Sequence, residues 1–444
     1  MAKKFMYITY YYPPRGGIGT IRVLKFQAQL IRMEASWQSL ILTPDDSAPS
    51  GMKWDAEFSY DDVYEVIRTR YIDIVPRKGT GSLSKRTKPS SGRFTLSRLA
   101  HELIVPDTRI GWVFPGREAA LRRLLTKDID LIYSTSPPET SHLIARDIAK
   151  YTGLPWIAEI RDPWGLKYDD IKKTSPRQAI DRQLEKWALR YATSLVVPTS
   201  GMKRAYQKIY PKKSITLIRN SFDPEHFAII GDSPSLDTFT LLHAGTIYSQ
   251  ELLEMFLEGL EIFLGANPSF KRKLFLAFCG PKNAYLEKIY AYKDYVLSPP
   301  DPVSYHDTLR GLKRANLIVV FNASDIAVPA KLYEAIGSGN PVLLITKNQQ
   351  SEAANITGNI RSGFVATSPE EVRAALGCVY GFWKDSMIIP PTENQIRPYS
   401  LETQTTALVK LFDNTSPRYH VGVDLAKGKD YSAIHYVQIP KELL

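Results

Sequence analysis

The sequence predicts an α/β fold with two domains, each built on a parallel sheet whose faces are covered by helices. Two observations carry this prediction. Short apolar runs typical of buried strands alternate with amphipathic helical segments, which is the pattern of parallel sheets. The alternation is interrupted at residues 221–237 (SFDPEHFAIIGDSPSLD), which are rich in turn-forming residues, and then restarts. A length of 444 residues agrees with two or three domains.

The elements of the first half follow from apolar periodicity. Strands are predicted at 4–11, 38–43, 63–74, 129–134, 155–160, 194–198 and 215–218, with helices at 20–33, 139–151 and 176–191. The first helix has Ile21, Leu24, Ala28 and Ile31 on one face. Ser200 can cap a helix that follows strand 194–198.

The second half repeats the rhythm. Strands are predicted at 238–245, 273–279, 294–298, 316–322 and 342–345, with helices at 250–264, 303–314, 329–337, 369–382 and 401–412. We therefore expect an N-terminal domain at 1–220, a linker at 221–237, a C-terminal domain at 238–395, a helix at 396–416 that packs back on the N-terminal domain, and an appended β-like tail at 417–444. The tail is similar to the first strand of RNase H-like nucleases, where Asp424 would bind a metal. One acid cannot build a two-metal site, so we expect an appended β-hairpin or a fusion remnant, and not a nuclease.

Composition bounds the protein class. The chain is 44% hydrophobic and 23% charged, as in soluble globular proteins, and no run approaches the roughly 18 apolar residues of a membrane span. The N-terminus lacks a signal-peptide pattern, and the two cysteines, Cys279 and Cys378, predict neither a disulfide framework nor a metal site. These observations predict a cytoplasmic protein.

The charge balance favours anionic partners. Net charge is +11, which suits nucleotide phosphates, anionic lipid or nucleic acid. Segment 77–98 holds seven Lys or Arg residues and no acid. Together with the apolar stripe that follows at 94–104, it could rest on an anionic membrane surface. The alternative is a solvated loop beside a helix that packs on its own domain.

Glycine-rich and polar loops follow the predicted strands. Arg15-Gly16-Gly17-Ile18-Gly19 forms a tight turn between strand and helix, without the dinucleotide spacing GxGxxG. Because the carboxyl ends of parallel strands meet at one edge, we expect one rim to contain 16–19, 134–138, 161–162 and 199–200. The second domain has its own rim, at 245–248, 280–281 and 329–334.

The stretch VPAKLYEAIGSGNPVLLIT (328–346) contains the sharpest pattern. Pro329 suits a helix start, and Lys331 and Glu334 are three apart, hence on one helix face. A helix N-terminus beside a cation favours phosphate, and a carboxylate one turn on can accept hydrogen bonds from sugar hydroxyls. The alternative is an ordinary surface ion pair.

Several segments together resemble the family 4 retaining glycosyltransferases of the GT-B fold. They are YYPPRGGIGTIRVLKF, DLIYSTSPPETSHLIA, PWIAEIRDPW, LIRNSFDPEHF and VPAKLYEAIGSGNPVL, and the resemblance covers about residues 3–413. It implies two facing Rossmann-like domains, a nucleotide-sugar donor on the C-terminal domain, an acceptor on the N-terminal domain, and retention at the anomeric carbon. It implies no cofactor and no metal.

The resemblance also implies residue roles. Glu334 would hold the ribose hydroxyls, Lys331 would neutralise diphosphate charge, and Gly16, Gly17 and Gly19 would approach the diphosphate and the sugar. Asn220 and Arg219 lie where the family joins its domains, and Pro329 begins the donor-gripping helix. The remaining donor contacts expected are Thr246, through hydrogen bonds to phosphate, and the cations Arg15 and Arg161.

Two departures from the family pattern affect the donor site. Ile326, next to Asp325, stands where a second glutamate is common, and the usual Arg and Lys are missing after strand 238–245. The sugar end of the site is therefore expected to differ from that of the family.

Acceptor chemistry is assigned to the loops of the first domain. A carboxylate near the anomeric carbon can deprotonate the acceptor hydroxyl, so we expect Asp162 to be the base and Arg161 a phosphate or acceptor clamp. The alternative is a local Arg161–Asp162 salt bridge. Ser136, Glu139 and Trp164 are expected on the acceptor side.

The leading expectation is therefore a glycosyltransferase that acts on a hydroxyl of a saccharide or lipid-linked saccharide, of the cell-surface polysaccharide type, in the cytoplasm or at the inner face of the membrane. One alternative is a DNA-modifying glycosyltransferase that acts on a hydroxylated base. Another is a non-catalytic nucleotide-sugar-binding protein. A sugar-nucleotide epimerase fits these motifs less well.

Overall fold

The computed structural model describes residues 3–45, 65–72, 74, 104–126, 128–166, 175–231, 234, 237–280, 296–297, 304–387, 389–415, 419–423 and 434–438. The basic segment 77–98, nearly all of the stripe that follows it, and Asp424 lie outside the described residues. The predictions made for them stay predictions.

The first sheet is parallel and has seven strands in the order β3-β2-β1-β4-β5-β6-β7. These strands are Glu65–Thr69, Trp37–Pro44, Lys3–Ile8, Leu131–Ser136, Trp156–Ile160, Ser194–Val197 and Ser214–Leu217. The helices between them are α1 (Ile18–Arg32), α3 (Val113–Leu124), α4 (Thr140–Thr152), α5 (Ser175–Leu189) and α6 (Ser200–Ile209). Helix α3 was not predicted, and β3 is shorter than expected.

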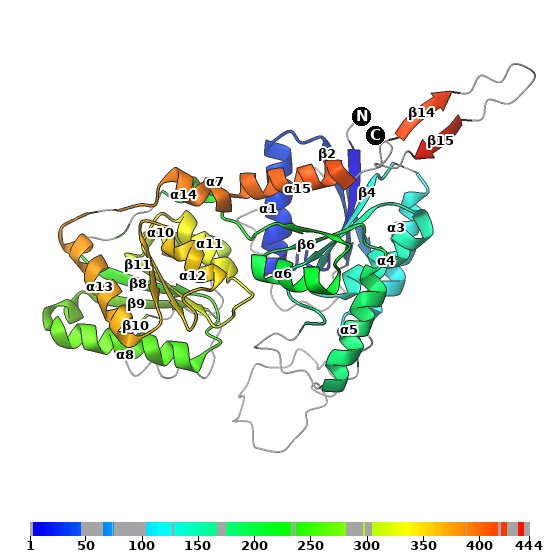
Figure 1. The fold of residues 1–444 in the computed structure, drawn as a ribbon. Helices are drawn as coiled ribbons and strands as arrows, with labels where there is room; N and C mark the ends of the chain where they lie inside the picture. The colour runs from blue at the N-terminus through cyan, green and yellow to red at the C-terminus, as the bar shows by residue number, and fades with distance from the viewer. Residues whose placement is uncertain are drawn as a thin grey trace, which may run out of the picture.

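Alternation along the strands explains why both faces of this sheet are covered. In β4, Ile132 packs with Ile144 of α4 in one core, while Tyr133 packs with Leu24 of α1 and Phe412 in the opposite core. Successive side chains of a strand point to opposite faces, so each apolar strand requires helices on both sides. Figure 1 shows α1 and α15 on one side of the sheet and α3 to α5 on the other.

The second sheet is also parallel, with the order β10-β9-β8-β11-β12-β13. Its strands are Val296–Leu297, Leu274–Cys279, Phe239–Ala244, Leu317–Asn322, Val342–Thr346 and Gly363–Ala366. Helices α8 (Gln250–Ala266) and α13 (Pro369–Lys384) contribute to the core on one face. Helices α10 (Tyr305–Arg314), α11 (Ala330–Gly337) and α12 (Glu352–Gly358) contribute to the core on the other.

The segment between the sheets contains a short helix, α7 (Pro224–Ile230), where only a linker was predicted. Asp223 caps it by accepting a hydrogen bond from the Glu225 amide at 3.1 Å, and Gly231 ends it with a φ of 64°. Asp-Pro at the start and glycine at the end are helix signals. The sequence interpretation took the same residues as turn formers.

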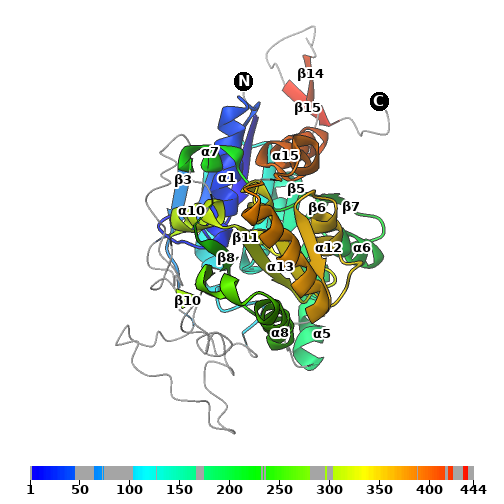
Figure 2. The same cartoon turned by 90° about the vertical axis from the view of Figure 1, so that its left-hand side faces the viewer.

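The chain crosses back to the first sheet near its end. After α14 (Glu393–Ile396), the backbone amide of Leu401 donates to the carbonyl of Phe222 at 2.8 Å, so the outgoing and returning segments lie side by side. Helix α15 (Leu401–Thr415) then packs along α1, where the rings of Phe412 and Phe5 are 4.8 Å apart. Figures 1 and 2 show α15 beside α1, and an antiparallel hairpin, β14 (Tyr419–Val423) with β15 (Ile434–Gln438), that extends away from the first domain.

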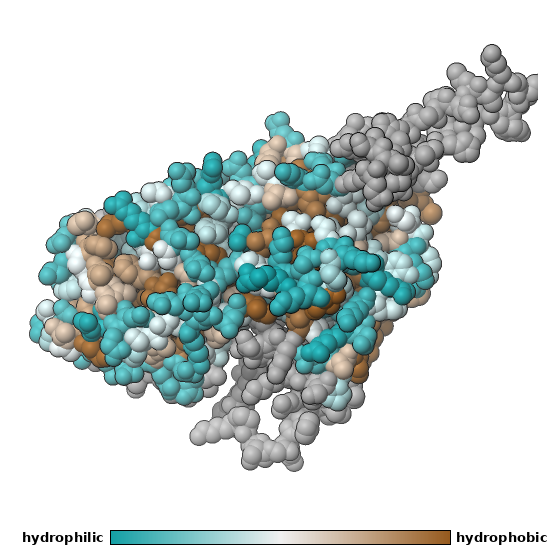
Figure 3. Space-filling view, in the orientation of Figure 1, coloured by the Kyte–Doolittle hydropathy of each residue, from teal (hydrophilic) through white to brown (hydrophobic). Residues whose placement is uncertain are grey.

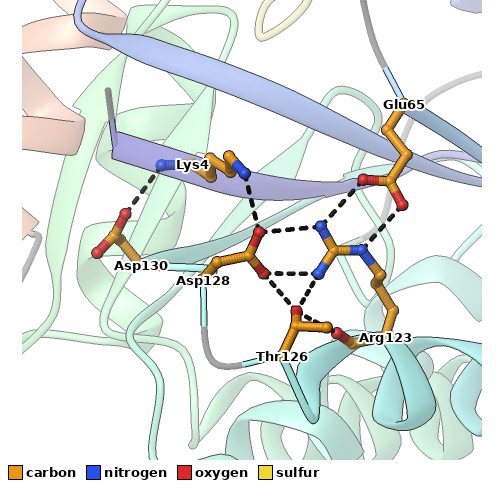
Figure 4. Close-up of polar contacts among 6 residues, drawn as sticks. All are labelled: Lys4, Glu65, Arg123, Thr126, Asp128 and Asp130. Carbon is orange, nitrogen blue, oxygen red and sulfur yellow. Dashed lines mark hydrogen bonds and ion pairs between the residues drawn. The ribbon is translucent and has the colours of Figure 1, made fainter. Parts of the chain in front are cut away.

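An ionic cluster joins the amino-terminal ends of the strands of the first sheet (Figure 4). The Arg123 guanidinium bonds both carboxylate oxygens of Glu65, at 2.8 and 2.9 Å, and both of Asp128, at 2.6 and 3.1 Å. These hydrogen bonds hold the pKa of Asp128 and the pKa of Glu65 below their usual range. Lys4 at the start of β1 adds a third contact to Asp128, at 2.8 Å. Because the cluster lies at the opposite end of the strands from the loops at 16–19 and 161–162, we assign it to fold stability.

On the face seen in Figure 3, hydrophilic residues cover most of both domains and apolar residues form small groups. Within the described part of the chain, no helix is long and apolar enough to cross a membrane.

Candidate functional site

The glycine-rich turn and Arg161 meet at the carboxyl ends of the strands of the first sheet. Gly17 precedes α1 with a φ of 105°, a conformation that favours glycine. A Cβ atom at Gly19 would lie 3.0 Å from the Tyr11 ring and 3.2 Å from Nη1 of Arg161. The absence of a side chain at Gly19 therefore lets the Tyr11 ring and the Arg161 guanidinium lie close against the backbone of the turn.

Arg161 also connects to the loop after β4. Its Nε donates to the Ser136 carbonyl at 2.9 Å and its Nη2 to the Pro137 carbonyl at 3.1 Å. The structure thus brings together three of the predicted elements: the turn at 16–19, the loop at 136–138 and Arg161.

Asp162 does not pair with Arg161. Within the described chain, its carboxylate has no hydrogen bond or ion pair, and part of its surface is open to solvent. The protein around it raises the pKa of the carboxyl group above its usual range, and the nearby Arg161 charge opposes this. The alternative of a local salt bridge is therefore wrong, and the geometry leaves a carboxylate with raised basicity available at this edge.

Two residues of the first domain that were predicted to contact the donor or the acceptor are buried instead. Arg15 is buried, and its guanidinium donates to the backbone carbonyls of Pro44, at 2.9 Å, and Asp45. Trp164 is 1% exposed and packs with Leu143 and Ala188. Both side chains are therefore buried in the first domain in this conformation.

Two further acceptor-side predictions lie around the same loop. The Ser136 side chain is fully buried, and its hydroxyl has no hydrogen-bond partner among the residues that the structure describes. Glu139 is half-buried and immediately precedes α4. Helix α6 likewise differs in detail from the prediction, because Thr199, not Ser200, caps it by accepting from the Met202 amide at 3.1 Å.

The second domain supplies the loop after β8 and the start of α11. Gly245 has a φ of 141°, and a Cβ placed there would lie 3.9 Å from the Lys331 side chain. Thr246 follows it and is half-buried, and Pro329 is the residue before α11. The loop after β8 and the start of α11 therefore lie side by side, with Gly245 next to Lys331.

Glu334 lies deeper than a surface ion pair would. It is 3% exposed, and its carboxylate contacts two ammonium groups: Lys331 Nζ at 2.8 Å and Lys25 Nζ at 3.4 Å. Burial alone would raise the pKa of Glu334, but the Lys331 and Lys25 charges outweigh it and lower the pKa to about 2. The carboxylate is therefore ionised and able to accept further hydrogen bonds.

Lys25 was missed by the sequence interpretation. It lies on α1 in the first domain, 309 positions before Glu334, and only the apolar face of this helix was considered. The sequence did show a lysine next to the apolar face of the predicted helix. It could not show that Glu334 is its partner, because the contact depends on the fold.

Arg22, one turn earlier on α1, was also missed. It connects the helix to Arg219 and Asn220, where the first domain passes into the segment that joins the domains. It donates to Glu159 at 2.7 Å, to the side chain of Asn220 at 3.0 Å and to the carbonyl of Arg219 at 3.0 Å. The side-chain oxygen of Asn220 is therefore already used as the acceptor of a hydrogen bond from Arg22.

Ile326, which stands where the family commonly has a second glutamate, lies against the first domain. The Ile326 carbonyl accepts a hydrogen bond from the Thr199 hydroxyl, and a Cβ at Gly201 would lie 2.8 Å from Ile326 Cα. Residue 326 thus serves as a contact between domains, and Asp325 is hydrogen-bonded to Asn348 at 2.7 Å.

A cavity lies between the domains beside these residues, with Lys25, Asn220 and Glu334 among its lining side chains. Its volume of about 20 Å³ corresponds to about one water molecule. In this conformation the cavity has no room for a nucleotide. Among the described residues, no group of three or more His, Cys, Asp or Glu side chains could hold a metal ion.

Comparison with known proteins identifies the class of the first domain. Residues 23–221 match the family model of the glycosyl transferase 4-like domain. The chain carries a glycosyltransferase domain. The match confirms the expected enzyme class, a glycosyltransferase, and its span includes Ser136, Arg161, Asp162 and Asn220. No curated protein sequence matches the chain significantly.

Solved structures confirm the fold over nearly the whole chain. Sucrose-phosphate synthase from Thermosynechococcus elongatus has a TM-score of 0.60 at 13% identity, over 93% of this chain and 98% of that one. Anabaena Alr3699/HepE in complex with UDP and glucose has a TM-score of 0.57 at 11% identity, over 93% and 100%. The trehalose-6-phosphate protein from E. coli bound with UDP-2-fluoro glucose has a TM-score of 0.56 at 12% identity, over 94% and 100%. The glycosyltransferase domain is thus the first half of a complete GT-B fold.

Proposed function

We propose that the protein transfers a sugar from a nucleotide-sugar donor to a hydroxyl group of a saccharide or lipid-linked saccharide, with retention at the anomeric carbon and without a metal. The observation that carries the proposal is the buried, ionised Glu334 beside Lys331 and Gly245 at the carboxyl end of the second sheet. Glu334 would accept hydrogen bonds from ribose hydroxyls, and Lys331 would face the diphosphate.

The acceptor half of the proposal rests on Asp162 and Arg161. In the transfer, the acceptor oxygen forms a bond to the anomeric carbon on the same face from which the phosphate departs, so the configuration is retained; the bond from that carbon to phosphate breaks, and the nucleoside diphosphate leaves with the electron pair. Asp162 would take the hydroxyl proton, for which a carboxyl group with a raised pKa is suited. Arg161 and the backbone of Gly16 to Gly19 would stabilise negative charge on the leaving group.

Two of the structural neighbours contain UDP or a UDP-sugar, which supports a nucleotide-sugar donor for this chain as well. We further propose that the protein acts in the cytoplasm on cell-surface polysaccharide precursors, with segment 77–98 at the inner face of the membrane.

A thermal-shift panel of UDP-, GDP-, ADP- and TDP-sugars tests the proposal. One donor should stabilise the protein by about 2.7 kcal/mol at 100 times its dissociation constant, and should be hydrolysed slowly without an acceptor. Binding without turnover would instead indicate a non-catalytic sugar-nucleotide-binding protein. No shift with any donor would contradict the proposal. Binding to DNA that weakens steeply with salt would favour a DNA acceptor.

A further inference from the structure

The carboxylate of Glu334 is held from both domains at once. Oε2 contacts Lys331 Nζ on its own helix at 2.8 Å, and Oε1 contacts Lys25 Nζ of α1 at 3.4 Å. Lys25 also donates to the carbonyl of Ser221 at 3.2 Å, in the segment that joins the domains. The pair of Lys25 with Glu334 therefore exists only while the two domains are in contact.

The two lysines differ in what else they can reach. The Lys331 side chain is 25% exposed and borders Gly245, whereas the Lys25 side chain is 6% exposed. If Lys331 turns to a diphosphate, Glu334 loses its closer partner while it remains buried. A buried carboxylate without a compensating charge is costly, so Lys25 then becomes the cation that keeps it ionised, beside the hydrogen bond from Tyr305.

We propose that Lys25 is a positioning residue for the donor: from the opposite domain, it keeps the Glu334 carboxylate charged and oriented toward the ribose hydroxyls. The inference rests on the proposed function and deepens it, because it makes donor binding depend on contact between the domains. With Lys25 on one oxygen, a carboxylate still has lone pairs free for two hydroxyl groups.

Every charged or titratable group around this pair bears on its pH dependence. Lys331 lies on α11 and Lys25 on α1, and the Tyr305 ring of α10 lies 5.4 Å from Lys25 Nζ and 5.5 Å from Lys331 Nζ. Asp223, the cap of α7, and His226 on that helix also interact electrostatically with the pair. Burial lowers the pKa of His226 to about 4, and the pKa of Glu334 is about 2. Neither group changes charge between pH 5 and 8, so a change in affinity over this range that a variant shares with the wild type comes from the nucleotide phosphate, whose second pKa is about 6.

The test is calorimetric titration of UDP, GDP, ADP and TDP into Lys25→Met between pH 5 and 8. Loss of the Lys25 charge should raise the pKa of Glu334, so the variant should bind the preferred nucleotide more weakly than the wild type, and the ratio of the two affinities should grow as the pH falls from 8 to 5. Lys203→Met, on the exposed face of α6, is the matched control and should behave as wild type.

Two more variants separate positioning from folding. Lys25→Arg keeps the charge and should keep the wild-type pH profile. Lys25→Met combined with Glu334→Gln should bind weakly at every pH, because the amide does not titrate. Unchanged binding by Lys25→Met, or an equal loss at all pH values, would overturn the inference. Failure of the wild type to bind any of the four nucleotides would overturn the proposed function itself.

Discussion

The Glu352 carboxylate of the C-terminal domain accepts hydrogen bonds from the backbone amide and the hydroxyl of Ser200 in the N-terminal domain, at 2.6 and 2.7 Å. The same carboxylate accepts from Arg219 at 3.0 Å. An anion at the N-terminus of a helix is favoured by the unpaired amides there. This contact closes the two domains on each other at the edge where the first sheet would meet a substrate.

We predict that Glu352→Gln loosens the contact between the domains. Glutamine keeps the shape of the side chain but loses the negative charge, which strengthens its hydrogen bonds with Ser200 and Arg219. The radius of gyration from small-angle X-ray scattering should increase. The control is Glu370→Gln, an exposed position on α13. If the scattering of the two variants is identical, Glu352 does not hold the domains together.

We predict that Asp162→Asn abolishes transfer while the protein still binds its donor. The carboxylate has no hydrogen bond or ion pair within the described residues, so its replacement should leave the fold intact. Loss of a general base should lower kcat by about 10² to 10⁴, with the donor KM within about threefold of wild type.

The pH profile gives a second measure of the same residue. Partial loss of solvent around Asp162 raises the pKa of its carboxyl group, so wild-type activity should fall as the pH drops through that raised value and the base becomes protonated. Asp385→Asn, at an exposed position after α13, should retain full activity and the same profile. A kcat near the wild-type value for Asp162→Asn would mean that another group takes the proton.

Replacing Arg22 should destabilise the first domain strongly. Its guanidinium pairs with Glu159, which is fully buried, and removing one member of such a pair typically costs about 3–5 kcal/mol. Chemical denaturation of Arg22→Met should show this loss in the free energy of unfolding. Arg122→Met, whose side chain is 76% exposed, should change it by less than about 0.5 kcal/mol. Equal stability of the two variants would disprove the role of the buried pair.

Stability should fall in mild acid because of His226. Burial lowers the pKa of His226 from 6.5 to about 4, although Asp223 opposes the shift. Between these values the unfolded chain binds a proton that the folded protein does not. His226 therefore contributes about 3 kcal/mol to the free energy of unfolding above pH 6.5, and this contribution is lost as the pH falls toward 4.

Denaturant titrations from pH 7 to 4 measure this effect. Wild type should lose stability more steeply than His226→Gln, by about 1.4 kcal/mol per pH unit near pH 5. Parallel curves for the two proteins would show that His226 does not titrate in this way.

Most of the fold could be predicted from the sequence because its signals are local. Apolar runs gave the strands of both sheets, and the stretch around Lys331 and Glu334 placed a loop, helix and strand where the structure has them. Helix α7 was missed because Asp223-Pro224 and Gly231 signal both turns and helix ends.

The candidate site was predictable only in part. Its missing members depend on contacts between residues far apart in the chain. Lys25 meets Glu334, and Ile326 meets Gly201, across a domain interface that no local pattern encodes. The same limit explains Arg15, which looks available in a glycine-rich turn but folds inward to the carbonyl of Pro44.

A structure of the protein bound to its preferred nucleoside diphosphate tests the central claim most directly. The account predicts ribose hydroxyls within about 3 Å of the Glu334 carboxylate, with the diphosphate between Lys331 and the glycine-rich turn. A nucleotide bound elsewhere, with Glu334 still paired to both lysines and no hydroxyl within reach, would contradict it.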